Sequence, residues 1–194
     1  MTKLLEVRNL TRTFGALNAV AGWRPYQAAR AGVARTFQIP KPYRHLSVVE
    51  NVALSAMLHD RTVAAACESA QAILADVGLA EYVDAPVRNL TVGLLKRLEV
   101  ARALALRPSL VLFDEIMAGL TPSEVKGMTN LVAGLPARGI TVIWVEHVLY
   151  AIMKTAPRIM VLHRGELIAD GAPEALVKDT AVIKAYLGEE MSLA

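Results

Sequence analysis

Two short apolar runs with a capped helix between them constrain the fold more than any other part of the chain. Residues 109–113 (SLVLF) and 140–145 (ITVIWV) carry no charge, which is typical of strands buried on both faces of a sheet. Between them, TPSE at residues 121–124 combines a capping box with proline at the first helical position, so a helix is expected from there to about Leu135. This order predicts a β-α-β unit with adjacent parallel strands and a right-handed crossover.

Helix signals dominate residues 45–106. Ser47 and Glu50 form a capping box, and Gly78 is a helix stop. These signals predict three helices, one starting near Val48, one over about residues 64–77 and one from about Thr91 to Leu106. The third helix has one apolar face and charged side chains away from it, namely Lys96, Glu99 and Arg102.

Strand and turn signals occur toward both ends of the chain. They predict a strand and turn over residues 3–15 and a short helix over residues 24–32 that ends at Gly32. A further strand is expected over residues 158–171, broken by a turn at Arg164-Gly165 and followed by a helix over residues 173–179.

Composition argues against several classes of protein. Hydrophobic residues make up 54% of the chain and charged residues 20%, which indicates a globular protein. The mean hydropathy of +0.38 is high, but no uncharged apolar run approaches the roughly 18 to 20 residues of a spanning helix, so we expect no direct membrane insertion. The net charge of +3 does not call for a nucleic-acid partner. The single cysteine, Cys67, is expected to be a small core residue of a cytoplasmic protein.

Charged side chains follow both strands of the predicted β-α-β unit. Asp114 and Glu115 end the first strand, and Glu146 and His147 end the second. Ligands of open parallel sheets bind outside the carboxyl ends of the strands. There, two carboxylates and a histidine suit a hydrated magnesium ion, an attacking water and a group that senses developing charge. The alternative is structural: Asp114 and Glu115 cap the following turn, and His147 is a hydrogen-bonded loop residue.

Five motifs, in this order along the chain, resemble those of the ATP-binding cassette (ABC) ATPases. RTFQ, ending at Gln38, resembles the Q-loop, and LTVGLLKRLEVARALALRPS resembles the signature helix. LVLFDE resembles the Walker B strand, AGLTPSE the D-loop and WVEH the loop of the switch histidine. Three stretches, GVARTFQIPKPYRHLSVVENV, DEIMAGLTPSE and DTAVIKAYLGEE, look like the ATP-binding subunits of branched-chain amino acid importers. The resemblance covers nearly the whole chain.

The resemblance implies roles for particular side chains in Mg-ATP chemistry. Asp114 and Gln38 would serve the magnesium ion. Glu115 would polarise the attacking water, with His147 as the switch histidine and Gln38 also in the catalytic set. A divalent cation and ATP are therefore the implied cofactors.

The resemblance also implies contacts with other molecules and subunits. Phe14 would stack on adenine, and Thr91 and Gly93 of the signature would face ATP held by a partner. The implied partners are transmembrane permease subunits and a second ABC ATPase subunit. The chain would lie on the inner, cytoplasmic face of the cell membrane as a peripheral subunit.

The implied fold is a P-loop NTPase-like ABC ATPase domain of the α/β class, with a parallel sheet core and a helical subdomain. Residues 1–22 would be a remnant of the N-terminal β-strand region. Residues 23–106 would hold the Q-loop and the helical signature subdomain. Residues 107–194 would form the Walker B, D-loop and H-loop part of the core, with the family's C-terminal tail.

Three residues depart from the family pattern. In the signature core, LTVGL stands where the general pattern is LSGGQ. Thr91 keeps a hydroxyl and Gly93 permits close backbone approach to a phosphate, but Leu94 replaces an amide. Ile116 stands where many relatives have proline, and Thr121 replaces the usual D-loop aspartate, which weakens the expected contacts across a dimer.

The phosphate loop is missing from the sequence. Its pattern, G-x-x-x-x-G-K-[ST], supplies backbone N–H groups that cradle the phosphates and a lysine that reaches the β/γ oxygens. None of the 12 glycines is followed by lysine. In relatives a strand, the loop, its helix and another strand separate the segments that meet here near residues 20–22. We therefore interpret the chain as internally deleted there, and we expect an underpacked core.

The energetics of this loss bear on function. Hydrogen bonds to charged groups contribute roughly 1.5–3 kcal/mol each, so losing several removes something on the order of 5–10 kcal/mol. Micromolar binding amounts to only about 8 kcal/mol in total. The residues that remain are therefore not expected to hold ATP by themselves.

Three functions follow from these observations. By resemblance, the chain is the ATP-hydrolysing, energy-coupling subunit of an importer for branched-chain amino acids or related amides. The alternative is a non-catalytic remnant that at most docks on a permease or pairs with an intact ATPase subunit. A metal hydrolase of another family would need further ligands, and His45, His59 and His163 lack ligand-like spacing.

Overall fold

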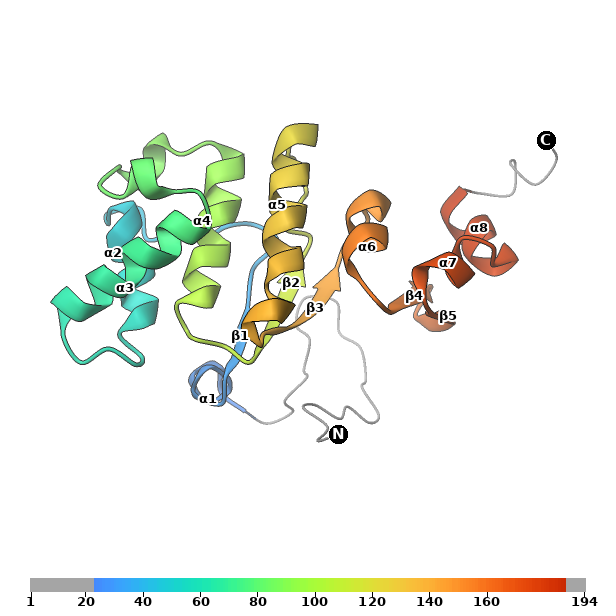
Figure 1. Cartoon of the computed structure of the whole chain (residues 1–194), viewed down its shortest axis with the longest axis horizontal. Coiled ribbons are helices and arrows are strands. Elements are labelled where there is room, and N and C mark those ends of the chain that lie inside the picture. The colour runs from blue at the N-terminus through green and yellow to red at the C-terminus, as the bar shows by residue number, and fades with distance from the viewer. Residues whose placement is uncertain (1–22, 188–194) are drawn as a thin grey trace. The chain divides into compact units, whose positions relative to one another are not determined.

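The computed structural model describes residues 23–187 of the chain (Figure 1). The chain divides into two compact units, Pro25–Thr155 and a second unit formed by Met1–Arg24 with Ala156–Ala194. The strand and turn expected over residues 3–15, together with Phe14, lie outside the described residues.

A parallel sheet of order β1-β2-β3 lies in the larger unit. β1 (Val33–Arg35) pairs with β2 (Leu110–Asp114), and β2 pairs with β3 (Thr141–Val145). α5 (Pro122–Gly134) leads from β2 toward β3, followed by the short 3-10 helix Pro136–Arg138. The helix begins at the predicted capping box and has Leu135 as its C-cap. The predicted β-α-β unit with adjacent parallel strands is confirmed.

The helices before β2 follow the predicted boundaries within about two residues, as expected for helix ends. They are α1 (Pro25–Arg30), α2 (Val48–Ala56), α3 (Val63–Asp76) and α4 (Val92–Leu104), with short 3-10 turns at Ala80–Tyr82 and Val87–Asn89. Gly32 and Gly78 follow α1 and α3 with positive φ of 82° and 74°, the left-handed conformation that ends a helix. In Figure 1, α4 lies between the α2–α3 pair and α5.

One hydrophobic cluster joins these helices to the sheet. Its largest fully buried side chains come from α3, α4, α5, β2 and the adjoining loops, and they include Leu74, Leu98, Phe113, Ile116, Met128 and Leu135. Cys67, expected as a small core residue, is partly buried against this cluster. Removal of this apolar surface from water is the main force that holds α2–α5 on β2.

β3 is less buried than its apolar sequence predicts. In β2 the residues from Leu110 to Phe113 are buried, whereas the central residues of β3 are half-buried and Val145 is 53% exposed. The reason is that, among the described strands, β2 has a neighbour on both sides and β3 has one only. The prediction of a strand buried on both faces is confirmed for β2 and wrong for β3.

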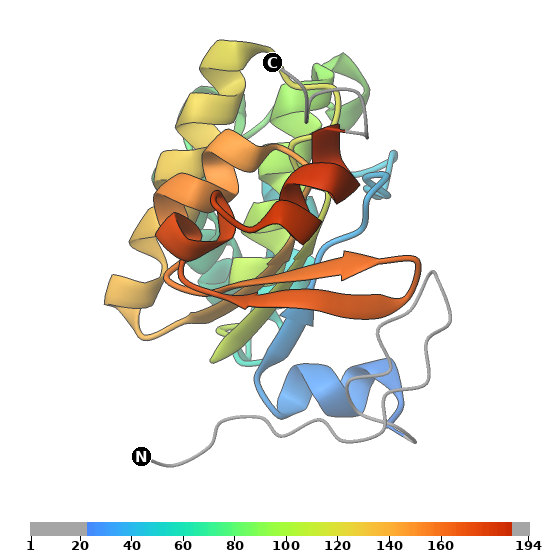
Figure 2. The ribbon, with the colours of Figure 1, turned by 90° about the vertical axis from the view of Figure 1, so that its right-hand side faces the viewer.

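The smaller unit contains an antiparallel hairpin, seen in Figure 2. β4 (Ile159–His163) and β5 (Glu166–Gly171) are joined at Arg164 and Gly165, whose φ values of 49° and 90° are left-handed, as a tight hairpin turn requires. The predicted break of the strand at this position is confirmed. Two helices follow, α7 (Pro173–Leu176), within the predicted range, and α8 (Thr180–Leu187).

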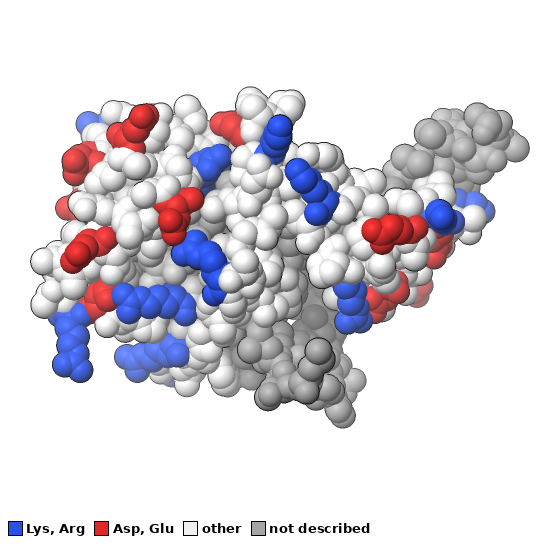
Figure 3. All heavy atoms as spheres, viewed as in Figure 1, with Lys and Arg blue, Asp and Glu red and all other residues white. Residues whose placement is uncertain are grey.

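Charged side chains of both signs are interspersed over the face of the larger unit seen in Figure 3. They form no single-sign block on that face, in agreement with the small net charge of +3. No helix in residues 23–187 is both long and apolar enough to cross a bilayer.

Candidate functional site

The charged residues that follow the strands meet at one edge of the sheet. Asp114, the last residue of β2, lies opposite Val145, the last residue of β3, so Glu146 and His147 continue from the same edge. Arg35 ends β1 at this edge as well. The prediction that Asp114 and His147 share one edge is confirmed.

Asp114 forms an ion pair with a cation of the neighbouring strand. Arg35 Nη2 lies 3.2 Å from Asp114 Oδ2, and both side chains are partly exposed. The buried hydroxyl of Thr36 accepts the backbone N–H of Asp114 at 3.4 Å. The carboxylate therefore faces a positive charge supplied by the protein itself.

Glu115 is held in an unusual backbone conformation. Its φ of 46° is left-handed, which is rare for a residue other than glycine. Two contacts hold its peptide groups, since its N–H donates to Val145 O at 2.9 Å and its carbonyl accepts from Lys96 at 3.0 Å. The amide of Gln38 donates to Glu115 Oε2. The Q-loop-like glutamine and the strand-end glutamate are thus in direct contact.

Lys96 of α4 contacts the backbone of both Gln38 and Glu115. It is 3% exposed, and its ammonium donates to the backbone carbonyls of both Gln38 and Glu115. Burial lowers the pKa of Lys96, whereas the nearby carboxylates, Glu146 first among them, oppose this shift. The lysine joins the segment after β1 to the loop after β2.

Glu146 is the carboxylate that orders the loop after β2. It is 8% exposed, and its Oε1 accepts the backbone N–H of Met117 at 2.8 Å. Its Oε2 accepts the N–H of His147 at 3.3 Å. The His147 side chain is exposed and makes no hydrogen bond within residues 23–187. In the structural alternative Asp114 and Glu115 cap this turn, but their carboxylates contact Arg35 and Gln38 instead.

The signature residues lie at the start of α4, against α5. Thr91 is the N-cap, and its hydroxyl accepts the N–H of Leu94 at 3.3 Å. Gly93 is buried, and a Cβ at this position would overlap the carboxylate of Glu124. Further along the two helices, a Cβ on Gly127 would overlap the guanidinium of Arg97. Glycine at 93 and 127 therefore permits the close packing of α4 on α5.

Glu124 closes the capping box of α5 with its side chain ionised. Its Oε2 accepts the N–H and the hydroxyl of Thr121, each at 2.8 Å. These two hydrogen bonds, helped by the nearby charge of Arg97, hold the pKa of Glu124 below its ordinary value of 4.5. Thr121, at the position of the usual D-loop aspartate, is thus engaged within its own helix.

Glu124→Gln is expected to lower thermal stability at neutral pH because the amide binds Thr121 less strongly than the carboxylate does. A lowered native pKa means that the native state binds fewer protons than the unfolded state below pH 4.5, so this stabilisation is lost as pH falls. The difference in Tm between wild type and variant should therefore shrink from neutral pH to about pH 3. Glu68→Gln, at an exposed glutamate of α3, is the control. A difference independent of pH would contradict the assignment.

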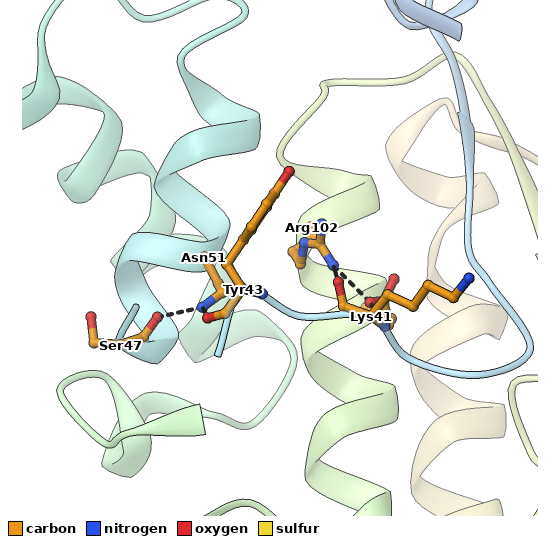
Figure 4. Close-up of polar contacts among 6 residues, drawn as sticks. Lys41, Tyr43, Ser47, Asn51 and Arg102 are labelled. Atoms are coloured by element: carbon orange, nitrogen blue, oxygen red, sulfur yellow. Dashed lines mark hydrogen bonds and ion pairs between the residues drawn. The ribbon is translucent and has the colours of Figure 1, made fainter. Parts of the chain in front are cut away.

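Asn51 of α2 anchors the segment between β1 and α2 (Figure 4). It is fully buried, and its Oδ1 accepts the N–H of Tyr43 at 2.8 Å. Its Nδ2 donates to the carbonyls of Tyr43 at 3.0 Å and Ser47 at 2.9 Å. One side chain therefore satisfies backbone groups on both sides of the turn at Arg44–Leu46.

Two residues of α4 bind the same segment further upstream, also shown in Figure 4. Glu99, 5% exposed, accepts the N–H of Lys41 at 2.9 Å, and Arg102 donates to the carbonyl of Lys41 at 3.0 Å. The two side chains also pair with each other at 2.7 Å. Residues 38–47 are thus fixed to α2 and α4 by charged and amide side chains.

Comparison with known proteins assigns the family. The sequence model described as "ABC transporter" matches residues 7–118, more than half of the chain. The chain belongs to the ABC transporter family. A second model, described as "Branched-chain amino acid ATP-binding cassette transporter", matches residues 166–191 of this ABC-family chain.

Named relatives are ATP-binding proteins of ABC transporters. The high-affinity branched-chain amino acid transport ATP-binding protein BraF of Pseudomonas aeruginosa is 33% identical over 186 residues, covering 88% of this chain and 73% of BraF. LivG of Escherichia coli, a protein of the same description, is 34% identical over 179 residues, covering 84% of this chain and 70% of LivG. The crystal structure of the ADP conformation of an ATP-binding cassette from an ABC transporter shares the fold, with a TM-score of 0.75 at 27% identity over 88% of this chain and 74% of that one.

Two cations of this ABC-family site were missed by sequence reasoning. In the sequence Arg35 stands out only as part of the RTFQ motif, and the helical pattern predicts Lys96 away from the apolar face of its helix. A signal for Lys96 was present, because it shares a helical stripe with Gly93, Val100 and Ala103, all of which are buried. A lysine on such a stripe requires polar partners, and the carbonyls of the Q-loop and Walker B segments provide them.

Proposed function

We propose that this chain is a non-hydrolysing relative of the ATP-binding subunits of branched-chain amino acid importers, and that it docks on permease subunits without binding Mg-ATP. One observation carries the proposal: the pattern G-x-x-x-x-G-K-[ST] occurs nowhere in the 194 residues. Catalysis of phosphoryl transfer depends on holding the phosphates in place. Without that cradle, Glu115 and His147 have no γ-phosphate to act on.

The contacts of the strand-end residues support this proposal because they do not fit Mg-ATP. Asp114 is paired with Arg35 at 3.2 Å, and Glu115 accepts from Gln38. Asp114, Gln38 and Glu115, which family resemblance assigns to magnesium and to the attacking water, are therefore engaged with groups of the protein itself.

The exposure of β3 supports an internal deletion near residues 20–22. An apolar strand in an open parallel sheet is normally covered on both faces, but Val145 is 53% exposed and the rest of β3 is half-buried or exposed. Loss of a neighbouring strand and helix would leave β3 in this state. The proposal accordingly retains the division into a remnant (1–22), a Q-loop and signature part (23–106) and a Walker B to H-loop part with its tail (107–194).

A mixed dimer, in which this chain's signature serves ATP held by an intact ATPase subunit, is less favoured. The carboxylate of Glu124 lies against Gly93, so it puts a negative charge beside the residue that the resemblance assigns to contact with a phosphate. Like charges so close repel each other. Pairing with a second ABC ATPase subunit remains part of the proposal as a structural contact.

A hollow beside the anchored segment supports the docking role. Its volume is about 550 Å³, and it is lined by residues of the segment after β1, of the turn before α4 and of α4 itself, namely Ile39, Pro40, Lys41, Pro42, Arg44, Val87, Arg88, Leu90 and Leu95. The lining is apolar and basic and contains no carboxylate. It therefore suits a cytoplasmic permease segment that carries apolar and acidic side chains, and it would hold the chain at the inner face of the membrane as a peripheral subunit.

The test is ATP binding and turnover by the purified chain. We expect calorimetry to detect no ATP binding tighter than millimolar, and phosphate release to stay at background, because no loop supplies amides and a lysine to the β/γ oxygens. Glu115→Gln is expected to change neither result. LivG of Escherichia coli, prepared in parallel, is the positive control.

One outcome would overturn the proposal. If the chain turns over ATP and Glu115→Gln abolishes that turnover, phosphate binding comes from residues not identified here and the chain is an ATPase. Sequencing the source DNA across codons 20–22 gives an independent check, since recovery of an in-frame phosphate loop would have the same consequence.

A further inference from the structure

Lys96 is the buried cation of the strand-end region. It is the only lysine or arginine among the buried polar and charged residues of the described chain, with 3% of its surface exposed. Both of its hydrogen bonds go to backbone carbonyls, one of Gln38 and one of Glu115. Carbonyl oxygens of this kind are also ligands that a divalent cation uses.

The carboxylates around Lys96 already have partners within the protein. Arg35 pairs with Asp114 at 3.2 Å, and Gln38 donates to Glu115. Backbone N–H groups donate to the other two, at 2.9 Å to Glu99 and at 2.8 Å to Glu146. All four carboxylates act electrostatically on Lys96. Each of these four carboxylates thus has a donor within the protein, and Lys96 and Arg35 supply positive charge among them.

We propose that Lys96, together with Arg35, is the built-in counter-cation of this edge, and that it holds the Gln38 segment against the Glu115 loop without a divalent ion. The inference rests on the proposed function and deepens it, because it states that two cations of the protein replace a bound divalent ion in this structural role. Lys96 is then a positioning residue that acts through two backbone carbonyls. Arg35 neutralises the carboxylate that would otherwise attract Mg²⁺.

The experiment measures metal binding by the full chain in the absence of nucleotide. Free Mn²⁺ is followed by electron paramagnetic resonance, and thermal unfolding is measured with Mg²⁺ and with EDTA. The variants are Lys96→Met, which removes the buried cation, and Arg35→Met, which uncovers Asp114. Lys96→Arg restores the charge, and Lys126→Met is the matched control at an exposed lysine of α5.

The wild type, Lys96→Arg and Lys126→Met are expected to leave Mn²⁺ free and to unfold at a Tm that neither Mg²⁺ nor EDTA changes. Lys96→Met should unfold several degrees lower, because the carbonyls of Gln38 and Glu115 each lose the hydrogen bond from the ammonium group. Both Lys96→Met and Arg35→Met should bind Mn²⁺ at least about tenfold more tightly than wild type. Mg²⁺ should raise the Tm of both variants, which a loss of packing alone would not produce.

Two results would overturn the inference. The first is binding of one Mn²⁺ by the wild type at submillimolar concentration, or stabilisation of the wild type by Mg²⁺. The second is that the folded variants bind Mn²⁺ no more tightly than wild type does and show no rise in Tm with Mg²⁺. If Lys96→Met does not fold, the results for Arg35→Met alone test the inference. The Arg35 side chain is 28% exposed, so its replacement disturbs the core less. Since no nucleotide is present, this outcome is separate from the ATP-binding test.

Discussion

Replacing Asn51 with leucine is expected to lower the free energy of unfolding of the larger unit by about 1–3 kcal/mol, the cost of leaving a buried backbone group without a partner. The Tyr43 N–H would lose its acceptor, whereas the carbonyls of Tyr43 and Ser47 would each lose one of two donors and keep a backbone N–H, that of Leu46 and that of residue 51. Leucine has the same number and branching of side-chain heavy atoms as asparagine but no polar atoms, so the loss mainly reports hydrogen bonding. Urea denaturation followed by circular dichroism measures it.

The matched control is Asn130→Leu, the same change at an exposed position of α5, which should alter stability by less than about 0.5 kcal/mol. Equal effects at the two positions would show that Asn51 does not anchor residues 43–47. The anchored segment also lines the proposed docking hollow. We therefore expect faster amide hydrogen exchange over residues 41–47 in Asn51→Leu than in wild type.

Phe113→Ala is expected to lower the free energy of unfolding by about 3–5 kcal/mol, the range for aromatic truncation in a core. Phe113 is 1% exposed and lies in β2, the central strand of the described sheet. Single domains have only about 5–15 kcal/mol in total, so the variant should lose a large share of its stability and unfold at a clearly lower urea concentration. Urea denaturation and the recovery of soluble protein both measure this effect.

Phe37→Ala provides the comparison, because Phe37 is 48% exposed and the same truncation there opens no cavity. It should change stability by less than about 1 kcal/mol. A small effect of Phe113→Ala would mean that α2–α5 are held together without β2. The single cluster around Phe113 would then not be the core of this unit.

Features set by neighbours in sequence were predicted correctly. The capping boxes at Ser47/Glu50 and Thr121/Glu124 each connect residues three apart, and both are present in the structure. The shared edge of Asp114 and His147 followed from the β-α-β order, because consecutive parallel strands bring their carboxyl ends together. Local signals and one topological rule were therefore sufficient to predict most of the helices and strands of the larger unit.

Features that depend on distant residues were not predicted. Lys96 and Gln38 are 58 positions apart in the sequence, and no residue pattern predicts that the two are in contact. The left-handed backbone of Glu115 arises from its bond to Val145 on the next strand, not from its own preference. The half-exposed state of β3 depends on which strands surround it, which an apolar run cannot reveal by itself.

Among the described strands, β3 pairs on one side only, and this affects how copies of the chain interact with one another. Within the described residues β3 pairs with β2 alone, and its sequence TVIWV contains neither a charge nor a proline that would discourage pairing with another molecule. An edge strand of this kind can pair with the same strand of a second copy. We therefore expect copies of the chain to associate through this edge of β3 when they are concentrated.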